Sequence, residues 1–222
     1  MFGARLSFGK SKVSGKKGRS VTKPHRAFVE RLEERRLLSV APNYMIVDSA
    51  APGAMDDANA DTHTLYEAIS YANAHSEIAD IYFADGLDEV TLDAALPTIT
   101  GNYDLDGSTI KGADGAEDSV RDGGVTIRRD SENAEQFRIL RISGGTAEDN
   151  VELIGLTITG GRKEEGGGIC SRGAVTITNS TISGNTASWG GGINHLGSGT
   201  LTVTNSTISG NSASFGGGIY NY

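Results

Sequence analysis

Three copies of one unit decide the fold: VELIGLTITGGRKEEGGGIC at residues 151–170, VTITNSTISGNTASWGGGIN at 175–194 and LTVTNSTISGNSASFGGGIY at 201–220. The copies are offset by 24 and then 26 residues. A fixed period in this range, with strand-like content and glycine-rich corners, is typical of repeat arrays. In such arrays each unit buries its apolar face only against its neighbours.

Apolar residues alternate with polar or small ones inside each unit, as a half-buried strand requires. Further apolar positions recur after each corner, at Ile158, Ile182 and Ile208, and again behind each glycine triplet. Thr, Ser, Asn, Gly and β-branched residues dominate, and strong helix formers are almost lacking, which argues against helices. The sequence therefore predicts three short β segments per unit, which together form one coil of a parallel β-helix.

Glycines mark the corners of each unit, because a sharp corner needs a positive φ or a backbone stacked closely on the next coil. The first corner of each unit is predicted at residues 160–161, 184–185 and 210–211, ahead of a second corner at a glycine triplet. The predicted corner triplets are Gly166, Gly167, Gly168, Gly190, Gly191, Gly192, Gly216, Gly217 and Gly218.

Two asparagine columns are expected to support the stack, Asn179 with Asn205 and Asn185 with Asn211. In parallel, in-register coils identical amides hydrogen-bond to one another as a ladder. The triplets at 179–181 and 205–207 also match the N-glycosylation sequon. We favour the ladder, since it already explains why the asparagines recur in register.

Aromatic residues align at Trp189 and Phe215, with Glu165 in the first unit. We expect them to pack at one corner, and a sugar-binding platform is the alternative. The single cysteine, Cys170, excludes an intrachain disulfide, and its column continues with Asn194 and Tyr220. We expect an unreactive thiol there, because no histidine is aligned beside it.

The units resemble those of right-handed parallel β-helix proteins of the pectate-lyase-like class. They are especially similar to the GGxI repeats of polymorphic outer-membrane-type surface proteins. The resemblance covers 151–222 and extends with decreasing clarity to about residue 80. It implies an all-β, right-handed parallel β-helix (a solenoid), and says little about activity because lyases, hydrolases, adhesins and passive stalks share that fold.

Charge divides the chain into two parts. Residues 1–36 contain 11 Lys or Arg and 3 acidic residues, a net charge of +8, whereas residues 37–222 contain 9 and 25, a net charge of −16. We predict that residues 1–40 form a basic, disordered export segment. A nucleic-acid-binding arm is the alternative, and we expect no nucleic-acid partner because the acidic remainder would repel it.

The stretch RLEERRLLS at 31–39 resembles the LExRxLLS motif near the start of many planctomycete-type secreted surface proteins. Its apolar run, 37–41, is too short for an ordinary signal peptide. Nothing elsewhere in the sequence approaches the roughly 18 apolar residues of a membrane span. The expected location, secreted or on the surface of the bacterial envelope, therefore follows from the resemblance.

Residues 41–79 are expected to form a linker and one helix. Thr64 and Glu67 have the spacing of a capping box, and Leu65, Ile69 and Ala72 form one apolar face. We predict that this helix caps the exposed hydrophobic end of the coils. The segment TLYEAISYANA also resembles the SLREAIxxAN stretch of a module that precedes such repeats in exported bacterial proteins.

Residues 80–222 are assigned to the β-helix, with irregular early coils and roughly six coils in all. Strands are expected at 81–83, 90–92, 98–99, 103–105, 125–127 and 137–142. The sequence stops just after a GGGI stretch. We expect either that relatives continue beyond this point or that the open coil associates end to end with a partner.

Catalytic residues are not predicted, and neither is a metal or cofactor site. Acid/base chemistry on a polysaccharide needs two or three ionisable groups close together, and the outward positions of the clean coils are Thr, Ser and Asn. The stretch Asp104-Leu105-Asp106-Gly107 offers oxygen ligands for Ca²⁺, but it is better explained as a turn. Arg162, Lys163, Glu164, Glu165 and Arg172 are assigned to solvated corners.

The sequence is therefore compatible with two functions. The first is an exported, surface-associated β-helix protein with a structural, adhesive or binding role, whose partner is an extracellular polysaccharide or another surface protein. The alternative is a carbohydrate-active enzyme, a polysaccharide lyase or glycoside hydrolase. The alternative requires the five ionisable side chains Asp104, Asp106, Arg128, Asp130 and Arg138 to converge in one groove.

Overall fold

The computed structural model describes residues 43–50, 63–111, 118–143 and 150–222. The segment 1–40, with its export motif, lies outside the described residues. Within them the chain is predominantly β, with one helix, and its sheets are parallel except for one short pair. Residues 43–222 form a single compact unit, and only this unit is considered below.

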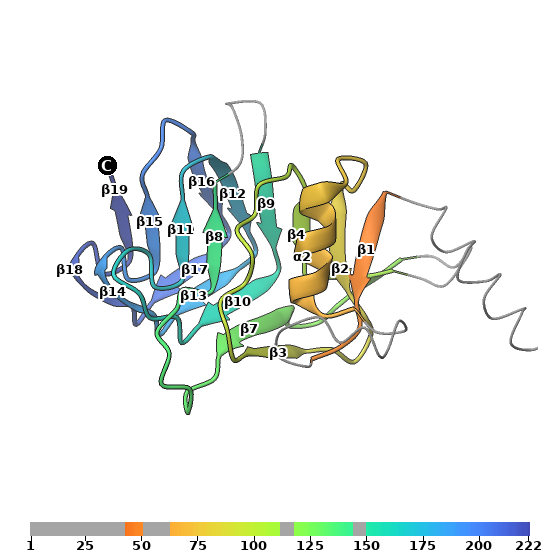
Figure 1. The fold of residues 1–222 in the computed structure, drawn as a ribbon, viewed down its shortest axis with the longest axis horizontal. Helices are drawn as coiled ribbons and strands as arrows, with labels where there is room; N and C mark the ends of the chain where they lie inside the picture. Colours follow the sequence, from red (N-terminus) through yellow and green to blue (C-terminus); the bar gives the residue numbers. More distant parts are fainter. Residues whose placement is uncertain (1–42, 51–62, 112–117, 144–149) are drawn as a thin grey trace, which may run out of the picture. The chain divides into compact units, whose positions relative to one another are not determined.

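Three parallel sheets make up the body of this unit (Figure 1). The first sheet contains, in spatial order, β1 (Tyr44–Val47), β2 (Asp80–Phe83), β4 (Asp104–Asp106), β9 (Asn150–Ile154), β12 (Ala174–Thr178) and β16 (Leu201–Thr204). The second contains β3 (Glu89–Leu92), β7 (Val125–Arg129), β10 (Leu156–Thr159), β13 (Thr181–Ser183) and β17 (Thr207–Ser209). The third contains β8 (Leu140–Ile142), β11 (Ile169–Ser171), β15 (Ile193–His195) and β19 (Ile219–Asn221).

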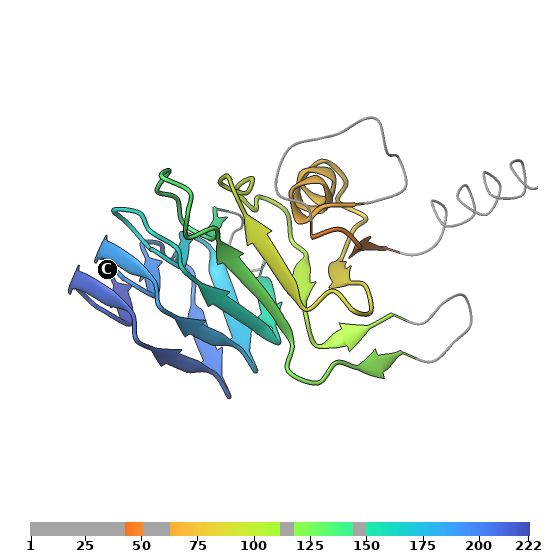
Figure 2. The ribbon, with the colours of Figure 1, turned by 90° about the horizontal axis from the view of Figure 1, so that it is seen from below.

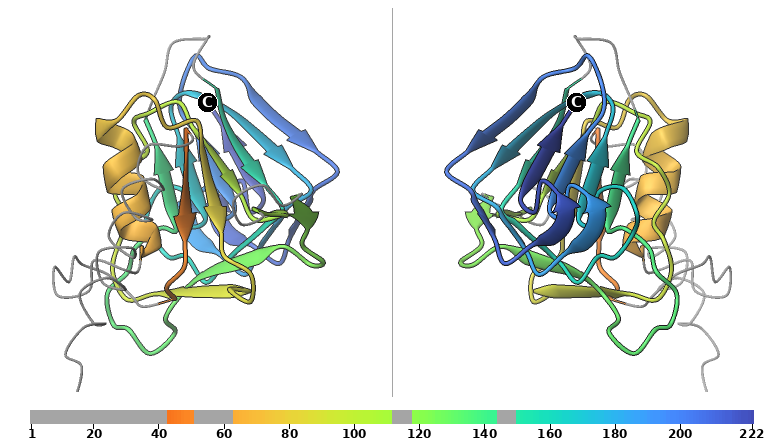
Figure 3. Two further views of the ribbon diagram at one scale, coloured as in Figure 1. Left: turned by 90° about the vertical axis from the view of Figure 1, so that its right-hand side faces the viewer. Right: turned by 90° about the vertical axis from the view of Figure 1, so that its left-hand side faces the viewer.

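Each predicted unit contributes one strand to each of the three sheets, in the order first, second, third. The register follows the sequence offsets: Val175 pairs with Val151 on one side and with Leu201 on the other. Ile193 likewise pairs with Ile169 and Ile219. Figure 3, which looks along the stack from both ends, shows the three sheets on different sides of a common interior.

Inward side chains of the three sheets form one apolar core. Alternating burial along β10 and β12 places Ile158 and Ile177 inside, each fully buried, while their threonine neighbours face outward. Branched apolar side chains suit this arrangement because they pack well on a pleated surface against the equivalent residue of the next strand. The predicted alternation is therefore confirmed in the first two units, whereas Val203 of β16 in the third unit is exposed.

The predicted helix is α2, Leu65–Ala74, and its capping box is present. Thr64 accepts a hydrogen bond from the Glu67 backbone N–H, and the Glu67 carboxylate accepts one from the Thr64 N–H. The buried face consists of Leu65, Ala68, Ile69 and Ala72. α2 lies on the same side of the stack as the third sheet (Figures 1 and 3).

Asn73 joins α2 to the segment that precedes β4. Its amide donates to the Thr98 carbonyl and accepts from the Thr100 N–H and the Tyr103 hydroxyl, at 2.8 to 2.9 Å. Ile99 in turn bridges in parallel to Ile142 of β8. The helix thus extends the side of the unit that the third sheet forms, beyond the first strand of that sheet. At that place its apolar face covers core residues that would otherwise be open.

Some early elements differ from the predicted strands. The stretch 137–142 is a strand only over β8, and 98–99 contributes a single bridge. β5 (Thr109–Ile110) and β6 (Ser119–Val120) form an antiparallel pair that the sequence analysis did not anticipate. Figure 2 shows this pair projecting to one side of the stacked strands. It interrupts the repeat between β4 and β7.

Candidate functional site

Three carboxylates lie in register on the outer face of the first sheet. Asp80 of β2 pairs with Asp104 of β4, and the pairing of Leu105 with Leu153 places Asp104 opposite Glu152 of β9. Neighbouring strands lie roughly 4.8 Å apart. We call Asp80, Asp104 and Glu152 the carboxylate column. The charges of Asp80 and Glu152 both act on the Asp104 carboxyl group.

Burial raises the pKa of Asp104 to about 6, with the nearby charges of Asp80, Glu152 and Asp106 adding to the effect. The hydrogen bond that the Glu152 backbone N–H donates to the Asp104 carboxylate, at 2.8 Å, acts in the opposite direction. Burial also raises the pKa of Asp80. Asp104 is therefore partly protonated near neutral pH, which is the range in which a carboxyl group can exchange protons with a substrate.

Two tyrosines and one lysine lie beside the column. The rings of Tyr44 and Tyr82 meet edge to face at 5.5 Å, and the Lys111 ammonium lies 4.4 Å from the centre of the Tyr82 ring. Lys111 also pairs with Asp118 at 2.7 Å, which raises the pKa of its ammonium group. The face thus combines acidic, aromatic and cationic groups next to the β5–β6 pair.

Asp106 has a structural role in the turn after β4. Its Oδ1 accepts hydrogen bonds from the Ser108 N–H at 2.7 Å, the Ser108 hydroxyl at 2.6 Å and the Thr109 N–H at 3.2 Å. This is the turn that the sequence analysis favoured over a Ca²⁺ loop. Across the ranges that the structure describes, no group of three or more His, Cys, Asp or Glu side chains is arranged to hold a metal ion.

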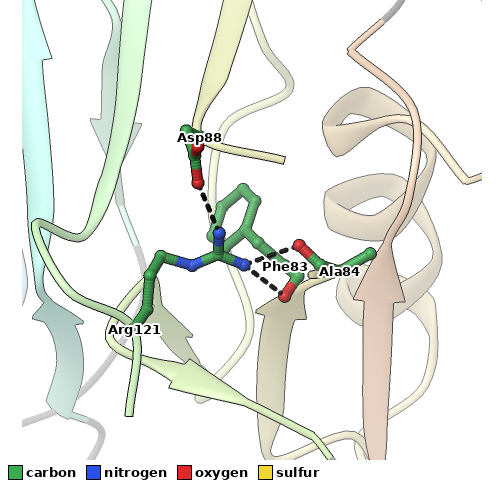
Figure 4. A network of polar contacts seen from close by, with 4 residues as sticks. All are labelled: Phe83, Ala84, Asp88 and Arg121. Carbon is green, nitrogen blue, oxygen red and sulfur yellow. Dashed lines mark hydrogen bonds and ion pairs between the residues drawn. The ribbon is translucent and has the colours of Figure 1, made fainter. Parts of the chain in front are cut away.

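Arg121 supplies a buried cation between the first two sheets (Figure 4). Its guanidinium donates to the Phe83 and Ala84 carbonyls at 3.0 and 2.6 Å and to the Asp88 carboxylate at 2.7 Å. The Arg121 side chain is 4% exposed, whereas that of Asp88 is 78% exposed. Because its donors point at carbonyls of the chain itself, Arg121 ties the β5–β6 segment to the end of β2.

The groove required for the enzymatic alternative draws on residues from different sheets. Asp104 and Asp106 belong to β4 of the first sheet, whereas Arg128 belongs to β7 of the second, where it pairs with Glu89 at 2.7 Å. Arg138 precedes β8 of the third sheet. Asp130 follows β7 and accepts from the Glu132 N–H within its own turn. The five side chains thus come from three sheets and their connections.

Asn185 and Asn211 form a hydrogen-bonded column between successive units. The Asn185 amide nitrogen donates to the Asn211 Oδ1 at 3.0 Å and to the Ile158 carbonyl, and its oxygen accepts from the Gly161 N–H. Asn211 repeats the pattern with the Ile182 carbonyl. Asn185 is fully buried, so these bonds satisfy a polar group that has no access to water.

Asparagine recurs at positions 179 and 205 for a different reason, which is the conformation of the backbone. Both residues adopt positive φ, 50° and 48°, and no side-chain hydrogen bond joins them within the described residues. The hydrogen bonds between units run instead through the next residue, where the Ser180 N–H donates to the Ser206 hydroxyl at 3.0 Å. Asparagine recurs at these positions because it tolerates the left-handed conformation better than other non-glycine residues.

The glycine triplets combine the two properties expected of corners. Their first members, Gly166, Gly190 and Gly216, have φ of 62°, 62° and 63°. A Cβ at the middle residue Gly191 would lie 2.5 Å from the Gly217 carbonyl oxygen of the next unit. The first position thus requires positive φ, and the second requires the absence of a side chain.

An aromatic corner follows from the same repeat. Short strands β14 (Thr186–Trp189) and β18 (Ser212–Phe215) pair in parallel, so that the rings of Trp189 and Phe215 are nearly parallel, with centres 6.4 Å apart. An open surface hollow of about 180 Å³ lies beside Trp189 and is lined also by Glu165, Asn194, Leu196, Tyr220 and Tyr222. Cys170 is buried in the third sheet, paired with Asn194.

In comparisons with known proteins, no family model, curated protein or solved structure matches the chain. Among the described residues, no helix has the length and apolar character needed to cross a membrane.

The carboxylate column was missed by the sequence analysis, although a signal for it existed. Asp80 and Asp104 are 24 residues apart and Asp104 and Glu152 are 48 apart, once and twice the first offset of the repeat. Extending that period backwards through the irregular units would have aligned all three. The weaker strand pattern before residue 150 concealed the alignment.

Proposed function

We propose that this chain is an exported right-handed parallel β-helix protein of the bacterial cell surface or its surroundings, with a structural, adhesive or binding role. Support for the fold comes from three parallel sheets that the chain visits in a fixed order with matched register. Support for export comes from the resemblance of residues 31–39 to LExRxLLS and of the GGxI units to those of surface proteins.

The observation that carries the proposal is the chemistry of the repeated outer face. In the three clean units, most outward side chains of the first and second sheets are hydroxyls in columns, such as Thr157–Thr181–Thr207 and Thr176–Thr202. Glu152 and Ile154, at the edge of this region, are the exceptions. Apart from Glu152, the repeated face offers hydroxyl groups and no charge, which suits hydrogen-bonded contact with extracellular material.

Surface labelling of cells tests the proposal. The full chain, expressed in a planctomycete host, is expected to be accessible to a membrane-impermeant biotin reagent and to added protease. A variant lacking residues 31–39 is expected to remain inside the cell. Retention of the full chain in the cytosol would contradict export, and a crystal structure with left-handed or unstacked coils would contradict the fold.

A second function, a carbohydrate-active enzyme, is favoured by the carboxylate column alone. Roughly 4.8 Å between strands places adjacent carboxylates near the separation used by retaining glycosidases, about 5 to 5.5 Å. Asp104, with a pKa of about 6, would act as the acid. Product release from pectin-like or alginate-like polymers, abolished by Asp104→Asn, would establish this function. If the purified chain releases no product from these polymers, the enzymatic function is excluded.

A further inference from the structure

Asn179 and Asn205 begin the only two N-glycosylation sequons of the sequence, Asn-Ser-Thr at 179–181 and at 205–207. In such a sequon the asparagine amide accepts the glycan, and the hydroxyl residue two positions later is required with it. Both sequons lie in the turn that leads from the first sheet to the second, between β12 and β13 and between β16 and β17. They therefore occupy the same place in two successive units.

The fold requires a backbone conformation at this place and does not require a side-chain amide. Asn179 and Asn205 both have positive φ, and the equivalent residue of the first unit is Gly155, with φ of 59°. Glycine adopts this conformation without strain. The side chains of the two asparagines are therefore available for another purpose.

Both amide groups are accessible and unengaged. Asn179 and Asn205 are exposed, and neither side chain has a hydrogen-bond partner within the described residues. Asn185 differs, because it is fully buried and its amide donates to Asn211 and to the Ile158 carbonyl. One asparagine column thus joins the units, whereas the other presents free amides to solvent.

The hydroxyl of the first sequon is also free. Thr181 lies on the outward side of β13, and its hydroxyl has no partner within the part of the chain that the structure describes. The hydroxyl of Thr178, by contrast, donates to the Glu152 carboxylate at 2.7 Å. Asn179 and Thr181 both line one open surface hollow of about 320 Å³. The two residues of the sequon are therefore reached from the same side of the molecule.

We propose that Asn179 and Asn205 are alternative acceptors for one N-linked glycan, donated by a saccharide carried on a polyprenyl diphosphate. The asparagine Nδ2 forms a bond to the anomeric carbon of the saccharide, and the bond from that carbon to the diphosphate oxygen breaks. The polyprenyl diphosphate leaves and the amide gives up one proton, so the step needs no oxidant or reductant. This modification rests on the proposed export, because N-glycosylation is a modification of secreted proteins.

One glycan per chain is expected because the two turns are stacked on one another. The Asn179 N–H donates to the Thr204 carbonyl of the next unit at 3.1 Å. Strands paired in this way lie roughly 4.8 Å apart. A glycan attached to one turn therefore covers the other and leaves a transferase no room to approach it.

Mass spectrometry of the full chain tests the proposal in two arms. In the first arm the chain is purified from the surface fraction of a planctomycete host. In the second arm the chain is made in a host without N-glycosylation and is incubated with a purified oligosaccharyltransferase of N-x-Ser/Thr specificity and a polyprenyl-diphosphate-linked oligosaccharide. Both arms should give the added mass of one glycan, and fragment spectra should place it on Asn179 in some chains and on Asn205 in others.

Matched substitutions identify the acceptors without disturbing the turn. Asn179→Gly and Asn205→Gly keep the conformation that Gly155 has, and each should move the whole modification to the remaining asparagine. Together they should abolish it. Thr181→Val with Thr207→Val should also abolish it while both asparagines remain, because valine keeps the β-branched shape and lacks the hydroxyl. Thr181→Ser with Thr207→Ser should retain it. Circular dichroism should show the same β content in all of these variants.

Three results would overturn the site: the exported chain carries no glycan, the glycan persists in the double valine variant, or one chain carries two glycans. Failure of this site and failure of the proposed function are distinguishable. A chain that reaches the cell surface without a glycan loses only the site. A chain that accepts a glycan from the purified transferase but remains in the cytosol of its host loses only the surface role.

Discussion

Asp104 illustrates how a single residue in a β stack acquires unusual acid–base behaviour. It is partly buried between Asp80 and Glu152, and burial raises the pKa of its carboxyl group to about 6. The folded chain therefore holds a proton that the unfolded chain, with an ordinary carboxyl pKa near 3.8, has already released. Stability contributed by the protonated form is lost as the pH rises through this interval.

We predict that the free energy of unfolding falls between about pH 4 and pH 6 because of Asp104, by at most about 3 kcal/mol. Asp104→Asn should remove this part of the pH dependence and be more stable than the unmodified chain above pH 6, since Asn still accepts from the Glu152 N–H. Urea unfolding at pH 4 and pH 7 measures both. Asp122→Asn, at an exposed turn, is the control and should retain the dependence.

Arg121 differs from Asp104, because the chain's own carbonyls stabilise its buried charge. Arg121→Met is expected to lower the free energy of unfolding by about 3 kcal/mol, because the carbonyls of Phe83 and Ala84 lose their donor. Asp88→Asn should cost less than about 1 kcal/mol, since the Asp88 side chain is 78% exposed and the amide oxygen still accepts. Equal losses in the two variants by chemical denaturation would show that the ion pair, rather than the carbonyl contacts, holds this segment.

At the scale of the element, the corners are more constrained than the strands. Each strand needs only alternating apolar and hydroxyl residues, which many sequences provide. A corner needs a particular backbone conformation and, in the triplets, close approach to the neighbouring unit. Gly190 and Gly210 separate the effect of backbone conformation from that of crowding, because both have positive φ, 62° and 61°, but only Gly190 is crowded, by the Ile193 carbonyl of its own unit.

We predict that Gly210→Ala costs about 1 kcal/mol, which is the penalty of a side chain in the left-handed region. Its added Cβ would have no atom closer than 3.9 Å. Gly190→Ala should cost at least about 3 kcal/mol, because its Cβ would lie 2.2 Å from the Ile193 carbonyl oxygen. Thermal unfolding of the two variants compares them directly. A similar cost for both would mean that backbone conformation alone explains the first glycine of each triplet.

We predict that the stacked strands behave as a nearest-neighbour array, in which each repeat is stabilised mainly by the one before and the one after. In the second sheet, Val90, Ile127, Ile158 and Ile182 lie in successive register on four neighbouring strands. Stability should therefore be coupled between adjacent members of this column and independent between distant ones.

A double-mutant cycle measures this coupling. Ile158→Ala and Ile182→Ala, on adjacent strands, should each cost about 2 to 4 kcal/mol and show an interaction energy of at least about 0.5 kcal/mol. Val90→Ala and Ile182→Ala, in the same column but three strand spacings or roughly 14 Å apart, should be additive within about 0.5 kcal/mol. Strong coupling in the second pair would show that the unit does not behave as a nearest-neighbour array.

The sequence predicted most reliably those features that repeat. The 24- and 26-residue offsets gave the pairing of Val175 with Val151 and Leu201, and the capping box gave α2 within one residue at each end. Both are local or periodic signals. The β5–β6 pair and the docking of α2 through Asn73 were not predicted, because each depends on contacts between segments that share no period.

By itself, then, the sequence determined the strand content, the parallel register of the repeated units and the single capped helix, since equal residues at equal offsets pack on one another wherever the stack begins. Only the tertiary structure decided which polar side chains meet. It brought Asp80, Asp104 and Glu152 into one column, buried Arg121 against two carbonyls, and left the buried Asn194 amide without a hydrogen-bond partner among the described residues while Asn185 was satisfied. The physical reason is that burial and hydrogen bonding of a polar group depend on the atoms around it, and those come from segments far apart in the chain.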